Sequence, residues 1–319
     1  MSTSIEVIAP VGASRAARRG LVFLTYTGLS WGTTGAVAEL VYRASDFGPM
    51  ALSFWRQLGG LVLLLAFLAV RPRASRPVRP LRRLRSRLPL LLGAGVGMAV
   101  FQAAYFVAVE ATGVAVATIV TLGCGPILTA AGARVLLGER IGHGGLAAVA
   151  GALCGLGILV GWNAEGVATT AGITLSVISA AGYATVTLLG RLAGRGPVGE
   201  DPFALTVWSF GVGTAVLLPL ALAEGIAPAG EGTAAAFGLV GYLAVFTTAL
   251  AYPLYFAGTA RVRAATASVM MLLEPASAAA IAVGFLDEPL TAATALGTLV
   301  LLGSIALLAV AESRRPALG

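Results

Sequence analysis

The chain of 319 residues is 58% hydrophobic and only 11% charged. Soluble domains carry about 25% charged residues, so the composition predicts a protein embedded in a lipid bilayer. The formal net charge of +7 comes from arginines in short gaps between apolar runs, which is a membrane pattern rather than a nucleic-acid-binding one. The sequence has no lysine, which excludes a Walker-type phosphate loop and with it an ATP-driven pump within this chain.

A membrane span needs about 20 mostly apolar residues. Residues 1–19 are predicted to be a cytoplasmic tail, because Arg15, Arg18 and Arg19 stand directly before a long apolar run, as in an uncleaved anchor. Residues 312–319 form the tail at the other end. Between the tails the sequence predicts an all-α polytopic membrane protein of ten transmembrane helices, near 20–42, 50–70, 88–109, 113–134, 144–162, 170–191, 203–222, 232–256, 262–286 and 291–311.

The distribution of arginine tests this helix count. With the N-terminus in the cytoplasm, 19 of the 21 arginines fall inside, Arg43 falls outside, and Arg56 lies within a span. Missing one helix would exchange the sides of every later loop, so the positive-inside rule favours an even count, both termini in the cytoplasm and a bacterial cytoplasmic membrane. The segment 71–87 holds eight arginines and no acid, and is interpreted as a topology anchor, with contact to anionic lipids as the alternative.

The chain also contains an internal repeat, with one unit over residues 20–162 and a second over 170–311. Each unit has five helices, an odd number, so the second copy must enter the membrane from the opposite side. Such inverted repeats are typical of secondary transporters, since they provide two near-equivalent states, one open to each side. The aligned pairs include Trp31 with Tyr183, Tyr105 with Tyr255, Pro126 with Pro275, and Glu139 with Glu288.

Short motifs recur in a fixed order along the chain. They are Ser30-Trp31-Gly32, a second helix that starts at Pro49 and contains Arg56, Pro126 with Leu137-Gly138-Glu139-Arg140, Leu273-Glu274-Pro275, and Asp287-Glu288-Pro289-Leu290. In order and spacing they resemble the EamA family of the drug/metabolite transporter superfamily over residues 20–311. The resemblance implies ten helices, cytoplasmic termini, and export or exchange of small organic molecules, with uptake in some members. It does not choose a ligand.

Glu274 is the first candidate for a functional role, because it falls near mid-bilayer. A charged side chain there costs about 2.5–3.5 kcal/mol on insertion scales. The side chain must therefore face a polar cavity, pair with another polar group or stay protonated. Each of these three situations suits a carboxyl group that exchanges a proton for substrate. Pro275 and Pro126 are predicted helix breaks, since proline removes a backbone donor. The alternative is a protonated Glu274 that only hydrogen-bonds neighbouring helices.

Trp31 and Tyr183 are predicted to line a central cavity, because both lie near the middle of their spans rather than in an interfacial belt. Such a cavity would suit a flat or amphipathic organic substrate; ordinary packing is the alternative. Arg56 and Glu39 lie at similar depths in two helices joined by a short loop, which predicts a structural ion pair. An outward gate or a carboxylate-binding site is the alternative for Arg56.

Further polar candidates for the cavity lining are Gln102, Tyr105, Tyr252 and Ser268, with Thr247 and Thr248. Cys124 and Cys154 lack metal or redox spacing and are interpreted as packing residues. No cluster of His, Cys, Asp and Glu suggests a metal, and neither a cofactor nor a nucleic-acid partner is predicted. The sequence leaves the oligomeric state open.

The leading hypothesis is a secondary transporter that exports a small metabolite or drug by alternating access, with proton coupling as an additional expectation. Uptake or exchange is the alternative within the same class. An intramembrane enzyme would need a nucleophile, metal or acid–base pair at one depth, and only Glu274 qualifies, without an evident partner. A membrane scaffold would not require the two-way symmetry of the repeat, so the repeat favours transport.

Overall fold

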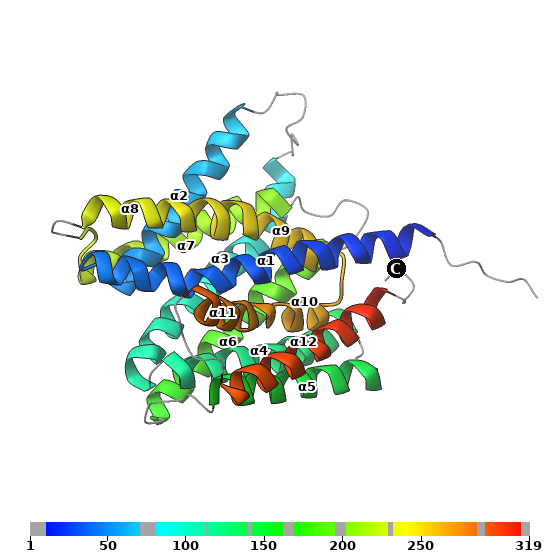
Figure 1. Ribbon diagram of the computed structural model, residues 1–319. Helices are drawn as coiled ribbons and strands as arrows, with labels where there is room; N and C mark the ends of the chain where they lie inside the picture. The colour runs from blue at the N-terminus through cyan, green and yellow to red at the C-terminus, as the bar shows by residue number, and fades with distance from the viewer. Residues whose placement is uncertain are drawn as a thin grey trace, which may run out of the picture.

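A computed structural model describes residues 11–70, 81–112, 114–139, 142–161, 169–194, 202–228, 232–285 and 291–313 (Figure 1). Every regular element in these ranges is a helix. The helices are α1 (Val11–Ala44), α2 (Pro49–Val70), α3 (Leu81–Thr112), α4 (Val114–Leu137), α5 (His143–Gly161), α6 (Thr170–Ala193), α7 (Pro202–Glu224), α8 (Thr233–Tyr242), the π-helix η2 (Leu243–Leu250), α9 (Ala251–Thr259), α10 (Ala264–Met270), α11 (Leu273–Phe285) and α12 (Ala292–Ser313).

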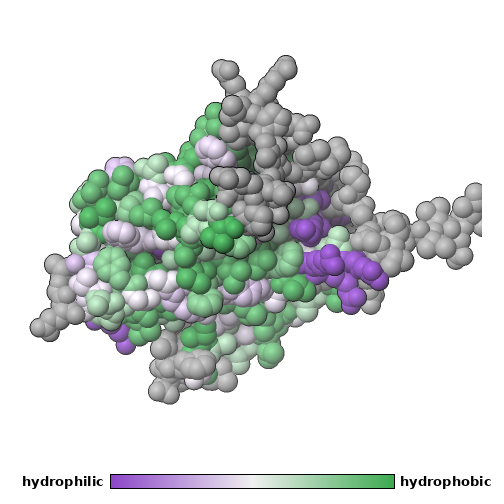
Figure 2. Space-filling view, turned by 90° about the horizontal axis from the view of Figure 1, so that it is seen from above, coloured by the Kyte–Doolittle hydropathy of each residue, from purple (hydrophilic) through white to green (hydrophobic). Residues whose placement is uncertain are grey.

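The helices are built to face lipid. Seven helical segments of the described residues are long and apolar enough to cross a membrane, namely α2, α3, α4, α6, α7, the run α8–η2–α9 and the run α10–α11. Helices α5 and α12 contain shorter apolar stretches. Large apolar side chains stand on the surface, among them Val22, Phe67 and Leu299, each more than half exposed. Most of the described surface in Figure 2 is accordingly hydrophobic. Soluble monomers rarely carry so much contiguous apolar surface, so the fold is that of a multi-pass membrane protein.

Several boundaries differ from the sequence predictions. Helix α1 already begins at Val11, inside the expected tail, and α3 begins at Leu81, inside the expected 71–87 loop. The predicted span 232–256 contains the π-helix η2, and the predicted span 262–286 is split into α10 and α11. The loop residues 71–80, the Glu288 motif and the ends of both tails lie outside the described residues.

The helices pack in pairs that are far apart in the sequence. The most extensive contacts join α3 with α6, α5 with α12, and α4 with α6, while α1 packs against α9 and α11. Glycine permits the closest approaches: a Cβ built on Gly182 of α6 would lie 2.8 Å from the Gly97 carbonyl of α3, and one on Gly32 of α1 would lie 2.8 Å from the Glu274 carbonyl of α11. Small residues therefore set the distances between these helices, as is usual in membranes.

The two ends of the bundle differ in charge. Helix α1 begins and α12 ends on the same side of the bundle (Figure 1). At that side Gly20 of α1 lies against the turn between α9 and α10, and α6 ends beside the same turn. We call this side the arginine-rich end and the other side the opposite end. The described arginines of the arginine-rich end are Arg15, Arg18, Arg19, Arg134, Arg191, Arg261 and Arg263.

One of the two cysteines differs from its predicted role. Cys124 is half-buried in α4, but Cys154 is exposed on α5. Position 154 therefore faces outward rather than packing against another helix, because α5 is covered on its other side by α12.

Candidate functional site

A small pocket lies in the middle of the bundle, where α1, α3, α6 and α9 meet. Its wall is aromatic and aliphatic, and it has room for about one water molecule. Five of its seven residues are aromatic, and their rings come from four helices. The pocket is lined by Trp31, Met98, Phe101, Tyr183, Val186, Tyr252 and Tyr255.

The rings of the pocket pack directly on one another. The ring of Trp31 lies 4.9 Å from that of Tyr252 and 5.4 Å from that of Tyr255, measured between centroids. On the other side Phe101 lies 5.6 Å from Tyr183. The structure thus brings together three residues that the sequence proposed as cavity lining, Trp31, Tyr183 and Tyr252. Separations of 4.5–7 Å are favourable for tilted aromatic pairs.

Trp31 is anchored to the π-helix η2. Its indole Nε1 donates to the Thr247 carbonyl at 2.9 Å, and the hydroxyl of Ser30 donates to the Phe246 carbonyl at 3.1 Å. Both acceptors lie within η2. A π-helix is rare and often marks a functional site. The Ser30-Trp31 motif of α1 is therefore bonded to the backbone of the most unusual helical segment in the described chain.

Two hydroxyl groups beside the pocket lack hydrogen bonds. The Tyr183 hydroxyl and Ser268 Oγ are buried, and neither meets a partner in good hydrogen-bond geometry among the described residues, although Ser268, Tyr255 and Thr187 all lie close to the Tyr183 hydroxyl. Tyr255, one helix away, is satisfied by Thr187 at 2.6 Å. Buried hydroxyls are normally paired, so the Tyr183 and Ser268 groups are available to a water or to a polar atom of a ligand.

Arg56 and Gln102 form a polar contact next to the aromatic pocket. Nη2 of Arg56 in α2 donates to Oε1 of Gln102 in α3 at 2.9 Å. The predicted partner of Arg56 was Glu39, which lies in α1 but whose side chain is outside the described residues. The charge of Arg56 also reaches Tyr252 and Glu274. Arg56 therefore belongs to the surroundings of the pocket.

Glu274 lies at a break in the chain. Helix α10 ends at Met270, two residues form a turn, and α11 begins at Leu273, so Glu274 stands in the first turn of α11. The break immediately precedes Pro275, because proline lacks the donor that would continue the ladder. Pro126, the aligned proline, does not interrupt α4, which is continuous from Val114 to Leu137. The predicted break at Pro126 is therefore absent.

The carboxyl group of Glu274 lies close enough to three tyrosines to interact with them electrostatically. They are Tyr105, Tyr183 and Tyr252. Tyr105 itself, in α3, exchanges a hydrogen bond of 2.8 Å with Thr118 of α4. The side chain of Glu274 is partly exposed within the bundle. In the described part of the chain no three His, Cys, Asp or Glu side chains gather as metal ligands. The chemistry available at Glu274 is thus that of a single carboxyl group near one arginine.

Sequence reasoning missed part of the pocket. Tyr255 was noticed only as a repeat partner of Tyr105, because it falls at the end of the predicted span 232–256, where an aromatic ring is expected in an interfacial belt. Phe101 and Met98 carry no polar atom and could not have been separated from ordinary core residues. Glu139 and Arg191 were treated as a motif residue and a topology marker, yet both are buried at the arginine-rich end, at 7% and 4% exposure.

Comparison with known proteins decides the family. A sequence model described as the EamA-like transporter family matches residues 18–161 and matches again over residues 170–310. This chain belongs to the EamA-like transporter family. The double match divides the chain into two family units, and the pocket lies between them, with Trp31 and Phe101 from the first and Tyr183 and Tyr252 from the second.

Similar proteins are named as transporters, and this chain matches nearly their whole length. The chain is 28% identical over 302 residues to the uncharacterized transporter YwfM of Bacillus subtilis, covering 93% of this chain and 96% of that one. It is 30% identical over 286 residues to an uncharacterized transporter of Archaeoglobus fulgidus, covering 84% and 94%. The uncharacterized inner membrane transporter YicL of Salmonella typhimurium is 27% identical over 308 residues, covering 93% and 97%.

A solved crystal structure has the same fold as this EamA-like chain. The two superpose with a TM-score of 0.72 over 95% of this chain and 98% of the other, at 18% sequence identity. At that identity the likeness concerns the fold alone. The residues of the pocket are therefore argued from their own contacts.

Proposed function

We propose that this protein is a secondary transporter that exports a small organic molecule across the cytoplasmic membrane by alternating access. The observation that carries the proposal is the aromatic pocket between the two family units, bordered by the unpaired hydroxyls of Tyr183 and Ser268. The pocket has room for about one water molecule, so an organic substrate can enter only when helices move apart. Alternating access supplies that movement.

The two family units act in this proposal as inverted five-helix repeats. The contacts between helices support this arrangement, because the main contacts made by helices of the first unit have counterparts made by the corresponding helices of the second unit. Helix α6 packs on α3 and α4, and α1 packs likewise on α8–η2–α9 and on α10–α11. Helices α2 and α7 pair with each other, as do α5 and α12. Counting α8–η2–α9 and α10–α11 as one span each gives ten spans.

The proposed orientation has the arginine-rich end in the cytoplasm, together with both termini. The positive-inside rule supports it, because 19 of the 21 arginines then face the cytoplasm. The eight arginines of residues 71–87 act as an anchor at that face, close to anionic lipid headgroups.

The pocket suggests the kind of substrate. Its rings favour a flat or amphipathic molecule, and the neighbouring Arg56 and Glu274 add one group of each charge. Glu274 is proposed as the coupling group, which releases a proton when the pocket changes sides.

Two measurements test the proposal. A comparison of metabolites in cells with and without the gene should reveal a compound that accumulates in cells lacking it. The purified protein in liposomes should then exchange that compound across the membrane without added energy. Chemical conversion of the compound would instead indicate an enzyme, and the absence of both exchange and conversion would contradict a transport role for this compound.

A further inference from the structure

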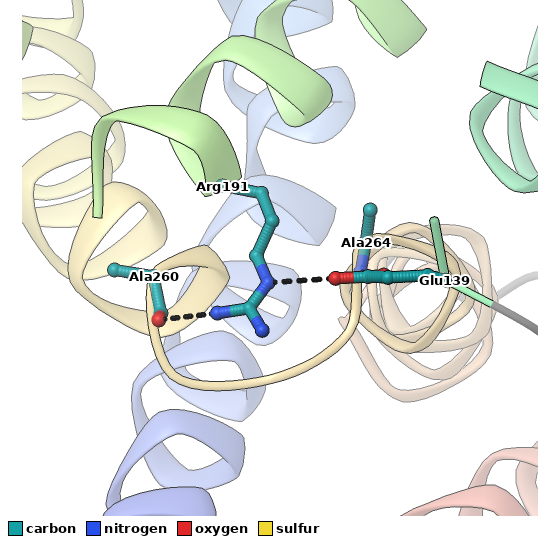
Figure 3. A network of polar contacts seen from close by, with 4 residues as sticks. All are labelled: Glu139, Arg191, Ala260 and Ala264. Atoms are coloured by element: carbon teal, nitrogen blue, oxygen red, sulfur yellow. Dashed lines mark hydrogen bonds and ion pairs between the residues drawn. The ribbon is translucent and has the colours of Figure 1, made fainter. Parts of the chain in front are cut away.

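A buried polar network joins four helices at the arginine-rich end (Figure 3). Glu139 follows α4, and its Oε1 accepts from Nε of Arg191 in α6 at 3.0 Å. Its Oε2 accepts from the backbone N of Ala264, the first residue of α10, at 3.0 Å. Nη1 of Arg191 donates to the carbonyl of Ala260, at the end of α9, at 2.6 Å. One carboxylate and one guanidinium thus tie α4, α6, α9 and α10 together.

The network is too well satisfied to be a chance surface contact. The side chains of Arg191 and Glu139 are each only 5% exposed. Burying two charges is costly unless they pair and accept or donate further hydrogen bonds. Here the two charges pair, both oxygens of Glu139 accept a bond, and Nε and Nη1 of Arg191 each donate one. Arg263, the N-cap residue of α10, gives that helix no side-chain cap, so Glu139 supplies the missing acceptor from another helix.

A second contact lies between this network and the pocket. The hydroxyls of Tyr255 in α9 and Thr187 in α6 share a hydrogen bond of 2.6 Å. Thr187 stands one helical turn before Arg191, and Tyr255 lines the pocket. Helices α6 and α9 are therefore joined twice on the way from the pocket to the arginine-rich end.

The repeat cannot build the same two contacts at the opposite end. Aligning Trp31 with Tyr183 sets Gly35 at the place of Thr187 and Glu39 at the place of Arg191. Glu139 itself aligns with Glu288. A glycine has no hydroxyl to share, and two acids cannot form an ion pair. The sequence therefore allows the double closure at one end only.

The packing of the described helices has the same asymmetry. Helix α6 packs against α9 and α10, whereas the equivalent packing of α1 against α3 and α4 is at most marginal among the described residues. Gly35 is exposed, and a Cβ built on it meets no atom within 4 Å. Among the described residues, the bundle is thus closed at the arginine-rich end, while α1 packs more loosely on α3 and α4 at the opposite end.

We propose that the Glu139–Arg191 network is a latch that holds the arginine-rich end closed, and that the repeat-related positions Gly35 and Glu39 supply no equivalent pair of contacts at the opposite end. The inference rests on the proposed transport function. The empty carrier then rests with its pocket directed to the opposite end, which is the external side in the proposed orientation. Opening toward the cytoplasm requires this latch and the Tyr255–Thr187 bond to part.

Accessibility of the pocket from each side tests the latch without a known substrate. A single reporter cysteine is introduced as Val186→Cys, in the pocket wall, after Cys124→Ala and Cys154→Ala. A membrane-impermeant maleimide is applied to whole cells and to inverted vesicles. Arg191→Gln should raise the labelling rate from the cytoplasmic side at least about tenfold, because labelling follows the population of the open state. Arg134→Gln, an exposed arginine on the last turn of α4, should label like the parent.

Some labelling results would contradict the proposed latch. A labelling rate unchanged by Arg191→Gln would overturn the latch. If Arg191→Gln does not fold, Thr187→Val decides the matter, since it keeps the shape and removes the bond to Tyr255 together with a bond to the Tyr183 carbonyl within α6. A rise in cytoplasmic labelling of about two- to fivefold supports the latch, and no rise overturns it. Labelling needs no transport, so a latch without substrate exchange would refute the transport proposal alone.

Discussion

Substituting Gly32 by alanine tests how closely α1 must approach the break between α10 and α11. A Cβ at this position would lie 1.8 Å from Ser277 Oγ and 2.8 Å from the Glu274 carbonyl. The hydroxyl of Ser277 could rotate away, but the carbonyl belongs to the backbone, so α1 must shift. Overpacking of this kind costs about 1–3 kcal/mol. Trp31 is the adjacent residue, so the shift should also disturb the pocket.

Gly35→Ala is the matched control for this substitution. It lies one turn further along the same helix, and its Cβ would meet nothing within 4 Å. Both variants gain the same helix propensity, about 1 kcal/mol, so the difference between them isolates the clash. Thermal unfolding in one detergent, followed by tryptophan fluorescence, should show Gly32→Ala melting several degrees below Gly35→Ala. Equal melting temperatures would refute the close packing of α1 on α11.

Three further predictions concern the pocket. Glu274→Gln should abolish the pH dependence of substrate exchange in liposomes while exchange itself persists; an unaltered pH profile would rule out its proposed coupling role. Trp31→Phe keeps an aromatic ring but loses the hydrogen bond to the Thr247 carbonyl, so it should lower the free energy of unfolding by about 1 kcal/mol. Thermal or denaturant unfolding measures this change, and a wild-type value would show that the bond is dispensable. Arg56→Lys keeps the charge but not the planar guanidinium that meets Gln102, so exchange of an anionic substrate should weaken more than exchange of a neutral one.

The sequence was sufficient for the class of fold and for the centre of the site. Composition alone indicated a membrane protein, and the repeat identified Trp31 and Tyr183 as equivalent mid-span aromatics, which the structure brings to one pocket. Their depth was informative because interfacial belts explain aromatic residues only at span ends.

Other features could not be read from the sequence. The π-helix η2 has an ordinary apolar composition with two threonines, so nothing marks its wider turns. Pro126 leaves α4 unbroken, since neighbouring groups in a membrane helix can satisfy the carbonyl that proline frees. Glu139 and Arg191 are 52 residues apart and flank predicted loops, where a charge is expected to meet water. Only the tertiary packing reveals that they are buried together.

Solute counterflow tests the central claim most directly. Liposomes containing the purified protein are loaded with the compound that accumulates in cells lacking the gene, and labelled compound is added outside. The account predicts transient accumulation of label without an energy source, and a clear loss of that accumulation when Tyr183→Ala removes one wall of the pocket. Accumulation that is the same with Tyr183→Ala as with the parent protein would contradict the pocket as the substrate site, and no accumulation with the parent protein would contradict transport of that compound.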